Sequence, residues 1–224
     1  MDSGVMQRTA STHPEGFTFL VWSGVGVGVL EERREDPLPK YFLSPGERVC
    51  LDERVLPQRQ PEWLRGRHAC KQVVRELLGP ELLMHRVEVL PGPQGEPQLH
   101  LQEGPGPLDV SISHTRTLSV AAVTSRGQVG VDVEPMAPVA ERLWHFFLSP
   151  AERARCEREP ELALRLWVLK EALYKALRPS QPIPLRSLVP ELGEGVLRLA
   201  PPFEWELSFT FLPLRNHLLA VVHS

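Results

Sequence analysis

Apolar runs of strand length recur along the chain and set its expected secondary structure. The stretch "FTFLVWSGVGVGVL" at 17–30 consists of two apolar runs separated by Ser-Gly, which predicts a β-hairpin with glycine bends. Its glycines do not follow GxGxxG, so a nucleotide-binding loop is the weaker interpretation. The stretch is too short to span a bilayer, which takes about 20 apolar residues, and no basic segment of a secretory signal precedes it. Later strand-like segments are "DVSISHT", "LSVAAVTS", "VGVDVE", "EWELSFTF" and "HLLAVVHS".

Helical periodicity is clearest in the second half of the chain. Apolar side chains spaced by three and four residues predict a buried stripe on a helix over 161–178, ended by Pro179. The stripe consists of Leu162, Leu166, Leu169, Leu173 and Ala176. A shorter helix is predicted at 149–158, and in the first half a helix that begins at Arg67 and ends at Gly79. Strands on both sides of a helical segment indicate an α+β fold with a helix packed on an antiparallel sheet.

Two short sequences occur twice. "SPGERV" at 44–49 recurs as "SPAERA" at 149–154, and each places Ser-Pro at the start of a short helix. A second match, offset by 104 positions, relates three residues of each half: Trp63, Arg67, Lys71 and Trp167, Glu171, Lys175. The two matches predict duplicated halves, 1–107 and 108–224, joined near the Pro/Gly-rich "EGPGPLD", with residues 1–15 flexible. The alternative is chance similarity, because both segments are common amphipathic helix types.

Composition excludes several classes of protein. With 42% hydrophobic and 24% charged residues, the 224-residue chain is globular rather than disordered. Its formal net charge of −3 lacks the basic excess of a nucleic-acid binder, so a site for anions has to be local. Three cysteines form no CxxC pair, which favours neither a disulfide framework nor a zinc site and is typical of reduced thiols in the cytoplasm. We therefore expect a cytoplasmic protein that binds neither nucleic acid nor membranes.

Two acids stand close together in "GVDVEP" at 130–135. Strand alternation places Gly130, Asp132 and Glu134 on one face, with the acids about 7 Å apart along the backbone. Carboxylates at that spacing can share one hard cation, and Mg²⁺ prefers oxygen ligands. The alternative is a solvent-facing strand edge with two ordinary acids.

The helix predicted over 161–178 carries a second candidate group. Trp167, Glu171 and Lys175 are spaced by four residues and therefore share one face. Glu171 and Lys175 are oriented for an ordinary surface salt bridge. With Lys170 nearby, the same carboxylate flanked by two lysines could instead bind a metal–diphosphate.

Smaller groups add candidate phosphate contacts. In "SISHT", Ser113 and His114 could donate hydrogen bonds to phosphate oxygens at a strand end; a serine hydrolase is disfavoured because no GxSxG elbow is present. Arg59 and Arg67 flank "QPEWLRG", and the guanidinium group suits phosphate recognition. Taken alone, both arginines could equally be ordinary residues of a helix surface.

Together these segments resemble the 4′-phosphopantetheinyl transferase superfamily, in its larger, Sfp-like, pseudo-dimeric type. The family signature is a G-[VI]-D-x-E strand followed by W-x-x-K-E-[AS]-x-x-K. Here "VGVDVEP" and "WVLKEALYK" place Asp132 and Glu171 39 residues apart. "SISHT", "WLRGRHA" and "GPQGEPQL" at 92–99 are also similar to family segments, so the resemblance covers roughly residues 40–178.

The resemblance implies a fold, a cofactor and a site. It implies two pseudo-symmetric α+β halves with the ligand in a cleft between them, in a monomer. The implied Mg²⁺ ligands are Asp132, Glu134 and Glu171, and the implied catalytic residues are Glu171, Asp132 and Lys175. The implied contacts to the coenzyme A phosphates are Arg59, Arg67, Ser113, His114, Lys170 and Lys175. One branch of the family has a lysine where this chain has Gln94, which leaves that contact open.

The implied reaction is that of holo-[acyl-carrier-protein] synthases and their relatives. The phosphopantetheine arm of coenzyme A moves to a serine of an apo acyl or peptidyl carrier protein, and 3′,5′-ADP leaves. The sequence does not choose among carriers of fatty-acid, polyketide or non-ribosomal peptide biosynthesis. It leaves open whether the base is Glu171 or a metal-bound water, and whether Glu134 ligates the metal directly. The alternatives are an inert coenzyme A- or carrier-binding module and a coenzyme A phosphohydrolase.

Overall fold

The computed structural model describes residues 7–12, 16–31, 39–101, 107–199 and 203–224. The chain divides into two compact units, 1–129 and 130–224. The division lies after the boundary at 107 expected from the sequence, because strands β6 (Asp109–His114) and β7 (Leu118–Thr124) hydrogen-bond into the sheet of the first unit. Residues 103–106 of the expected linker, "EGPGPLD" at 103–109, lie outside the described residues. Within the described ranges, no helix combines the length and apolar character needed to cross a membrane.

The first unit contains a five-stranded sheet in the order β1-β2-β3-β7-β6, with antiparallel neighbours throughout. The predicted hairpin is confirmed as β2 (Phe17–Trp22) and β3 (Val25–Glu31). Ser23 and Gly24 both have positive φ angles, 47° and 81°, as a two-residue type I′ turn requires. Within the segment expected to be flexible, β1 (Gln7–Thr12) pairs with β2; residues 1–6 and 13–15 lie outside the described residues.

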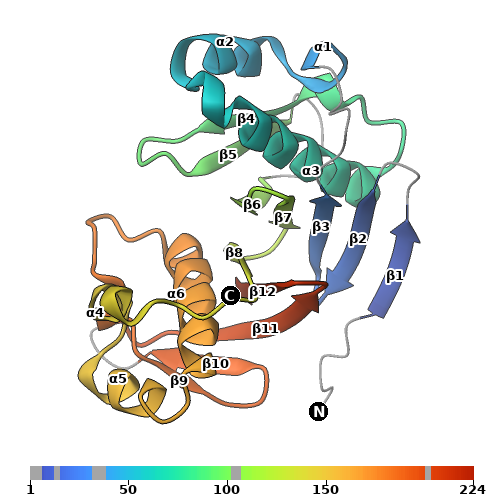
Figure 1. Ribbon diagram of the computed structural model, residues 1–224. Helices are drawn as coiled ribbons and strands as arrows, with labels where there is room; N and C mark the ends of the chain where they lie inside the picture. The colour runs from blue at the N-terminus through green and yellow to red at the C-terminus, as the bar shows by residue number, and fades with distance from the viewer. Residues whose placement is uncertain (1–6, 13–15, 32–38, 102–106, 200–202) are drawn as a thin grey trace. The chain divides into compact units, whose positions relative to one another are not determined.

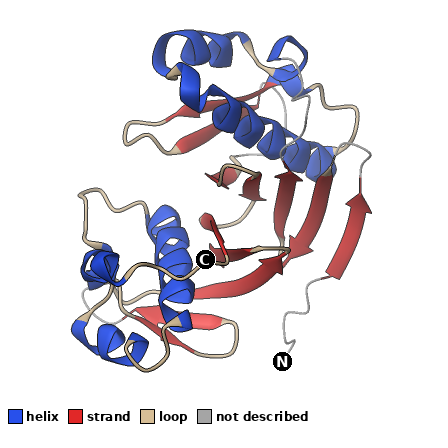
Figure 2. Cartoon of the chain, viewed as in Figure 1, coloured by secondary structure: helices blue, strands red, loops and turns tan. Residues whose placement is uncertain are grey.

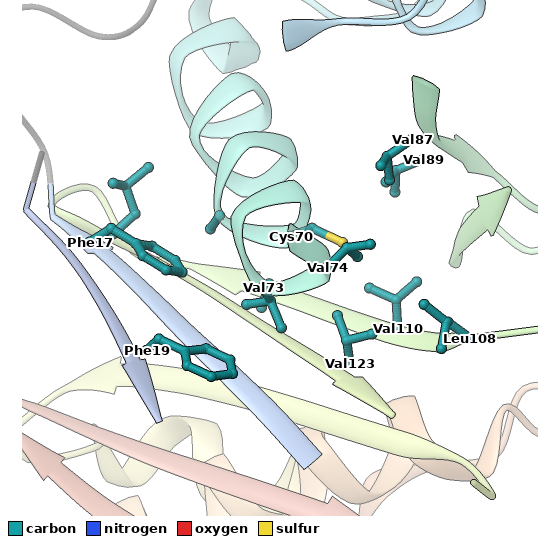
Figure 3. Close-up of a cluster of buried hydrophobic side chains, with 13 residues drawn as sticks. Phe17, Phe19, Cys70, Val73, Val74, Val87, Val89, Leu108, Val110 and Val123 are labelled. Carbon is teal, nitrogen blue, oxygen red and sulfur yellow. The ribbon is translucent and has the colours of Figure 1, made fainter. Parts of the chain in front are cut away.

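A 19-residue helix, α3 (Gln60–Leu78), packs on this sheet, as Figures 1 and 3 show. It begins at Gln60, so the predicted start at Arg67 was wrong. Proline is compatible with the first helical turn, where Pro61 lies, and Gly66 does not interrupt the helix. Val73 and other residues of α3 form the core with strand residues such as Phe19.

Short helices and a two-stranded hairpin complete the first unit. These are α1 (Pro39–Phe42), α2 (Pro45–Arg54), η1 (Pro57–Arg59), η2 (Met84–Arg86) and the hairpin of β4 (Val87–Pro91) and β5 (Pro97–Leu101).

The second unit contains another five-stranded sheet, in the order β8-β12-β11-β10-β9. Its strands are β8 (Val129–Pro135), β9 (Pro190–Leu192), β10 (Val196–Leu199), β11 (Glu206–Leu214) and β12 (His217–His223). Helix α6 (Glu161–Leu177) packs on this sheet through Leu169, Leu173 and neighbouring apolar residues. The other helices are η3 (Glu141–Leu143), α4 (Trp144–Phe147), α5 (Pro150–Cys156) and η4 (Leu185–Ser187).

The α+β class predicted from the sequence is confirmed. Figure 2 shows helices and strands in both units. The predicted helices at 149–158 and 161–178 correspond to α5 and α6, each within a few residues. Arg178 adopts a left-handed conformation with φ 44°, which ends α6 just before Pro179.

Each unit buries a lysine against the glutamate of a helix capping box. In the first unit, Ser44 and Glu47 cap α2 reciprocally. The Lys71 ammonium of α3 donates to Glu47 Oε2 at 2.5 Å, to the Phe42 carbonyl at 2.7 Å and to the Met84 carbonyl at 3.1 Å. The side chains of Lys71 and Glu47 are fully buried, so this pair ties α3 to the start of α2.

The second unit repeats this arrangement. Ser149 and Glu152 cap α5, and the Lys170 ammonium of α6 donates to Glu152 Oε2 at 2.6 Å and to the Phe147 carbonyl at 2.8 Å. Glu152 follows Glu47 by 105 positions, as the sequence repeat indicated, but Lys170 follows Lys71 by only 99. By its contact with the capping glutamate, Lys71 of the first unit therefore corresponds to Lys170 of the second unit. The match of Lys71 to Lys175 expected from the sequence repeat was wrong, because Lys175 does not contact Glu152 but bonds to Asp132.

Loss of the buried lysine should destabilise the second unit. Burial lowers the pKa of Lys170, and its contact with Glu152 opposes that shift. Lys170→Met leaves Glu152 charged and buried without its ammonium, which typically costs about 3–5 kcal/mol. Urea unfolding followed by tryptophan fluorescence should show this loss. Arg153→Met, which breaks an exposed pair with Glu157, should change the unfolding free energy by less than about 1 kcal/mol. Equal stability of the two variants would contradict a structural role for Lys170.

Candidate functional site

Strand β8 presents its acids as the alternation of the sequence predicted. Val131 and Val133 are buried in the core, with at most 1% of their surface exposed. Asp132 is 5% exposed, and Glu134 is half-buried near the strand end. A carboxylate so little exposed needs compensating partners.

Helix α6 supplies those partners from one face. The Trp167 indole Nε1 donates to Glu134 Oε1 at 3.0 Å. Two turns later, the Lys175 ammonium donates to Asp132 Oδ1 at 2.7 Å and to the Val131 carbonyl at 3.1 Å. Glu171 lies between them on the same helix face, one turn from each. Helix α6 therefore places the Glu171 carboxylate between Trp167, which bonds to Glu134, and Lys175, which bonds to Asp132.

A close approach of the backbones makes these contacts possible. A Cβ atom on Gly130 would lie 1.8 Å from the Ala172 carbonyl oxygen and 2.6 Å from the Ala176 nitrogen. No larger residue fits between β8 and α6 at this point. Ala172 and Ala176 are themselves small and buried, so helix and strand meet directly.

Two of the three carboxylates, Glu171 and Glu134, are disfavoured as charged groups in this position. Burial raises the pKa of Glu171, and the charges of Asp132 and Glu134 raise it further, while Lys175 opposes the shift. Burial also raises the pKa of Glu134, as does Asp132; the hydrogen bond from Trp167 is the largest opposing effect. The group is thus an acidic cluster with one ammonium, and it would gain stability from additional positive charge.

The donor chemistry of this acidic cluster fits a hard divalent cation such as Mg²⁺, which prefers carboxylate oxygens. The cluster is not a ready-made cage, however. In the ranges that the structure describes, no three His, Cys, Asp or Glu side chains lie close enough together to enclose an ion. Lys175 already holds Asp132, so a cation that binds Asp132 has to compete with that ammonium.

Lys170 does not join the acidic cluster, although it precedes Glu171 directly. Consecutive helix residues point about 100° apart, and this rotation turns Lys170 into the core. Its side chain is fully buried and is held by Glu152 and the Phe147 carbonyl. This position argues against the predicted phosphate contact and assigns Lys170 a structural role.

The first unit has a cavity of about 240 Å³ where α3 meets β6 and the β4–β5 hairpin. Three of the residues predicted to contact coenzyme A line it: Arg59, Arg67 and His114. The remaining lining residues are Glu62, Trp63, Gly66, Gly95, Pro97 and Ile112. The structure thus brings together three cationic or ionisable side chains that the sequence separates by up to 55 positions.

Aromatic stacking holds one of these cations. The Arg67 guanidinium lies over the Trp63 ring at 4.1 Å from its centroid. Arg67 is partly buried, and burial lowers its pKa. The spacing of four residues on a helix is the sequence signal that could have linked Trp63 to the site.

An acid moderates the positive charge of the cavity. Glu62 Oε2 lies 3.4 Å from Arg59 Nη1 and 3.8 Å from His114 Nδ1. The sequence interpretation did not include Glu62, because a single glutamate in the first turn of a helix is common. An anionic ligand in this cavity would share Arg59 and His114 with Glu62.

Two other predicted positions lie beside the cavity rather than in its wall. Ser113 is buried, and strand alternation places it on the face of β6 opposite Ile112 and His114, which line the cavity. Gln94 is at the tip of the β4–β5 hairpin, where its backbone N–H donates to Glu96 Oε2 at 2.9 Å. Its neighbour Gly95 lines the cavity.

The acidic cluster should cost stability at neutral pH. Because the folded-state pKa of Glu171 lies above the ordinary value, the folded protein binds this proton more tightly than the unfolded chain. Stability therefore falls as pH rises through the interval between the two values. Glu171→Gln should raise the free energy of unfolding at about pH 7.5 by roughly 0.5–1 kcal/mol, as removal of unfavourable charge commonly does. Near pH 4, where Glu171 is mostly protonated, the gain should vanish.

Urea unfolding at the two pH values measures this difference. Glu157→Gln, at an exposed position of the same unit, is the control and should show no such pH-dependent gain. A Glu171→Gln protein less stable than the parent at the higher pH would contradict the electrostatic account.

Comparison with known proteins identifies the family of the region that contains these residues. A family model described as 4′-phosphopantetheinyl transferase superfamily matches residues 128–222, which include β8 and α6. A holo-[acyl-carrier-protein] synthase of Geobacillus kaustophilus is 31% identical over 111 residues, covering 45% of this chain and 85% of the relative. The corresponding synthase of Enterococcus faecalis is 30% identical over 110 residues, covering 45% of this chain and 93% of the relative.

A longer alignment extends the similarity. A Synechocystis protein provisionally named a 4′-phosphopantetheinyl transferase is 26% identical over 163 residues, or 69% of this chain. The aligned region spans 65% of that relative's length, slightly less than two thirds. With most of two synthases aligned at 30% identity or more, the chain belongs to the 4′-phosphopantetheinyl transferase superfamily and is a transferase of that superfamily, as its paired motifs predicted.

Proposed function

We propose that this protein transfers the 4′-phosphopantetheine arm of coenzyme A to a serine of an apo carrier protein, releasing 3′,5′-ADP. The observation that carries this proposal is the acidic cluster of Asp132, Glu134 and Glu171, built by β8 and α6 inside the region that matches the family. The names of two relatives specify an acyl carrier protein as the acceptor. The nucleophile is the serine of the carrier protein, so this chain does not need to supply one.

The cavity of the first unit is the proposed site for the nucleotide end of coenzyme A. Arginine forms paired hydrogen bonds with phosphate, and Arg67 is already held against Trp63 in a suitable position. Arg59 and His114 add two more donors to the same cavity. The aromatic, apolar and charged walls together suit a ligand that has both a base and phosphate groups.

The acidic cluster is the proposed site for chemistry at the diphosphate. Its carboxylates Asp132, Glu134 and Glu171 would hold Mg²⁺, which when bound supplies positive charge to the phosphate oxygens. Lys175 would orient Asp132 and offer a further ammonium to the phosphates. The serine oxygen of the carrier bonds to the β-phosphorus as the bond from that phosphorus to the leaving 3′,5′-ADP breaks.

Glu171 is the proposed acceptor of the serine proton. A general base works best when its pKa approaches the operating pH, and burial next to two other acids raises the pKa of Glu171 in that direction. Its position in the middle of the α6 face, between Trp167 and Lys175, keeps it beside the strand acids.

The direct test is transfer to a carrier. The full chain is incubated with coenzyme A, Mg²⁺ and apo acyl carrier protein, and mass spectrometry follows the addition of one phosphopantetheine to the carrier. Asp132→Ala and Glu171→Ala should each reduce the rate by about 100-fold or more, because each removes a group that acts in the transition state. Glu157→Ala, at an exposed position of the same unit, should transfer at the parental rate.

Two results would contradict the proposal. Near-parental transfer by Glu171→Ala would remove both its metal and its base role. Consumption of coenzyme A without an acceptor would identify a hydrolase, and binding of coenzyme A without any reaction would identify an inert module.

The cavity is tested separately through affinity. Arg67→Gln should raise the KM for coenzyme A about tenfold or more with little change in kcat, since loss of a charged hydrogen bond costs about 1.5–3 kcal/mol. Arg75→Gln, on the same helix but with its guanidinium bonded to the exposed Pro80 carbonyl, is the matched control. A change in kcat alone, or equal effects of the two variants, would contradict a binding role for the cavity.

A further inference from the structure

Trp167 is partly buried and is packed against apolar residues of the second unit on more than one side. Its ring packs edge-to-face against Phe147, with centroids 4.9 Å apart and planes at 75°. It also contacts both apolar clusters of this unit, one built around α6 and the sheet, the other around Trp144 and Phe147. A ring held on these sides cannot rotate without disturbing the core, so its N–H has one direction.

That direction is toward the acidic cluster. The indole Nε1 lies 3.0 Å from Glu134 Oε1. Glu134 is near the end of β8, where exposure increases along the strand, and the exposed Pro135 and Met136 follow it. Repulsion from Asp132 and partial burial both disfavour a charged Glu134 at this place, and the Trp167 hydrogen bond opposes them. Without the indole, solvent is the more favourable direction for this flexible side chain.

Asp132 and Glu134 of β8 thus accept hydrogen bonds from chemically different donors on α6. Asp132 is held by an ammonium, which a cation must displace or share. Glu134 is held by a neutral donor that occupies one oxygen and carries no competing charge. An indole N–H can therefore remain bonded while the other carboxylate oxygen turns to a cation.

We propose that Trp167 is a positioning residue that presents Glu134 to the divalent cation through its indole N–H. This inference rests on the proposed function, because the cation is part of that proposal. It assigns Trp167 a polar role in addition to its packing, and it makes Glu134 a direct contributor to cation affinity.

The test measures cation binding by the full chain without coenzyme A or carrier. Electron paramagnetic resonance of free Mn²⁺ gives the dissociation constant for the parent and for Trp167→Phe, which retains an aromatic ring but lacks the N–H. We expect Mn²⁺ to bind about fivefold more weakly to Trp167→Phe, the factor that corresponds to one neutral hydrogen bond. Trp144→Phe is the matched control, because it removes an indole N–H bonded to the Val139 carbonyl at 3.1 Å in the same unit. Its Mn²⁺ affinity should equal that of the parent.

A double-mutant cycle separates positioning from packing. Glu134→Gln should itself weaken Mn²⁺ binding, and adding Trp167→Phe to it should cause no further loss. If Trp167→Phe does not fold, replacement of Trp167 by 3-benzothienylalanine retains the bicyclic shape and removes only the N–H.

The outcomes are distinguishable. Parental affinity in the N–H-deleted variants, equal weakening in Trp144→Phe, or additive losses in the cycle would each overturn the inference. If the parent still transfers phosphopantetheine in those cases, the proposed function survives. A parent that neither binds Mn²⁺ nor transfers the arm would overturn both.

Discussion

The direct contact between α6 and β8 at Gly130 is the constraint on which the acidic cluster depends. Because a Cβ at this position would overlap the Ala172 carbonyl, only glycine allows helix and strand to approach this closely. At that distance the indole N–H of Trp167 can bond to Glu134, and the ammonium of Lys175 can bond to Asp132, from the same helix face. The close approach also buries the carboxylates in part, and burial is the main cause of the raised pKa values of Glu134 and Glu171. A wider spacing would leave an ordinary helix surface above an ordinary strand edge.

Stability and chemistry are divided between neighbouring residues of α6. Lys170 points into the core and connects the helix to the cap of α5, while Glu171 lies on the face of the acidic cluster, where burial and neighbouring acids raise its pKa. The first unit repeats this buried lysine–glutamate pair with Lys71 and Glu47. A shared structural device thus supports two units with different surfaces, one offering cationic side chains in a cavity and the other clustered acids.

Local patterns predicted much of this arrangement. The Ser-Gly break located the β2–β3 hairpin, apolar spacing located α6, and alternation placed Asp132 and Glu134 together. The burial of Lys170 also had a signal, since it lies four residues after Leu166 and three before Leu173, inside the apolar stripe. That signal was missed because a lysine beside a motif glutamate was interpreted as a ligand contact. The start of α3, the stacking of Trp63 on Arg67 and the bond from Trp167 to Glu134 depend on packing between distant segments, which periodicity does not encode.

The ammonium of Lys175 has a consequence for how ligands enter. With three carboxylates ionised and one ammonium, the acidic cluster sums to −3 + 1 = −2. A dianionic ligand that arrives alone meets like charge, whereas a dication brings the sum to zero. Ion and anion would therefore assist each other's binding by the same factor, as thermodynamic reciprocity requires. Neutralisation of charge at the acidic cluster, rather than a rigid cage of ligands, would control when the cation and the anionic ligand bind.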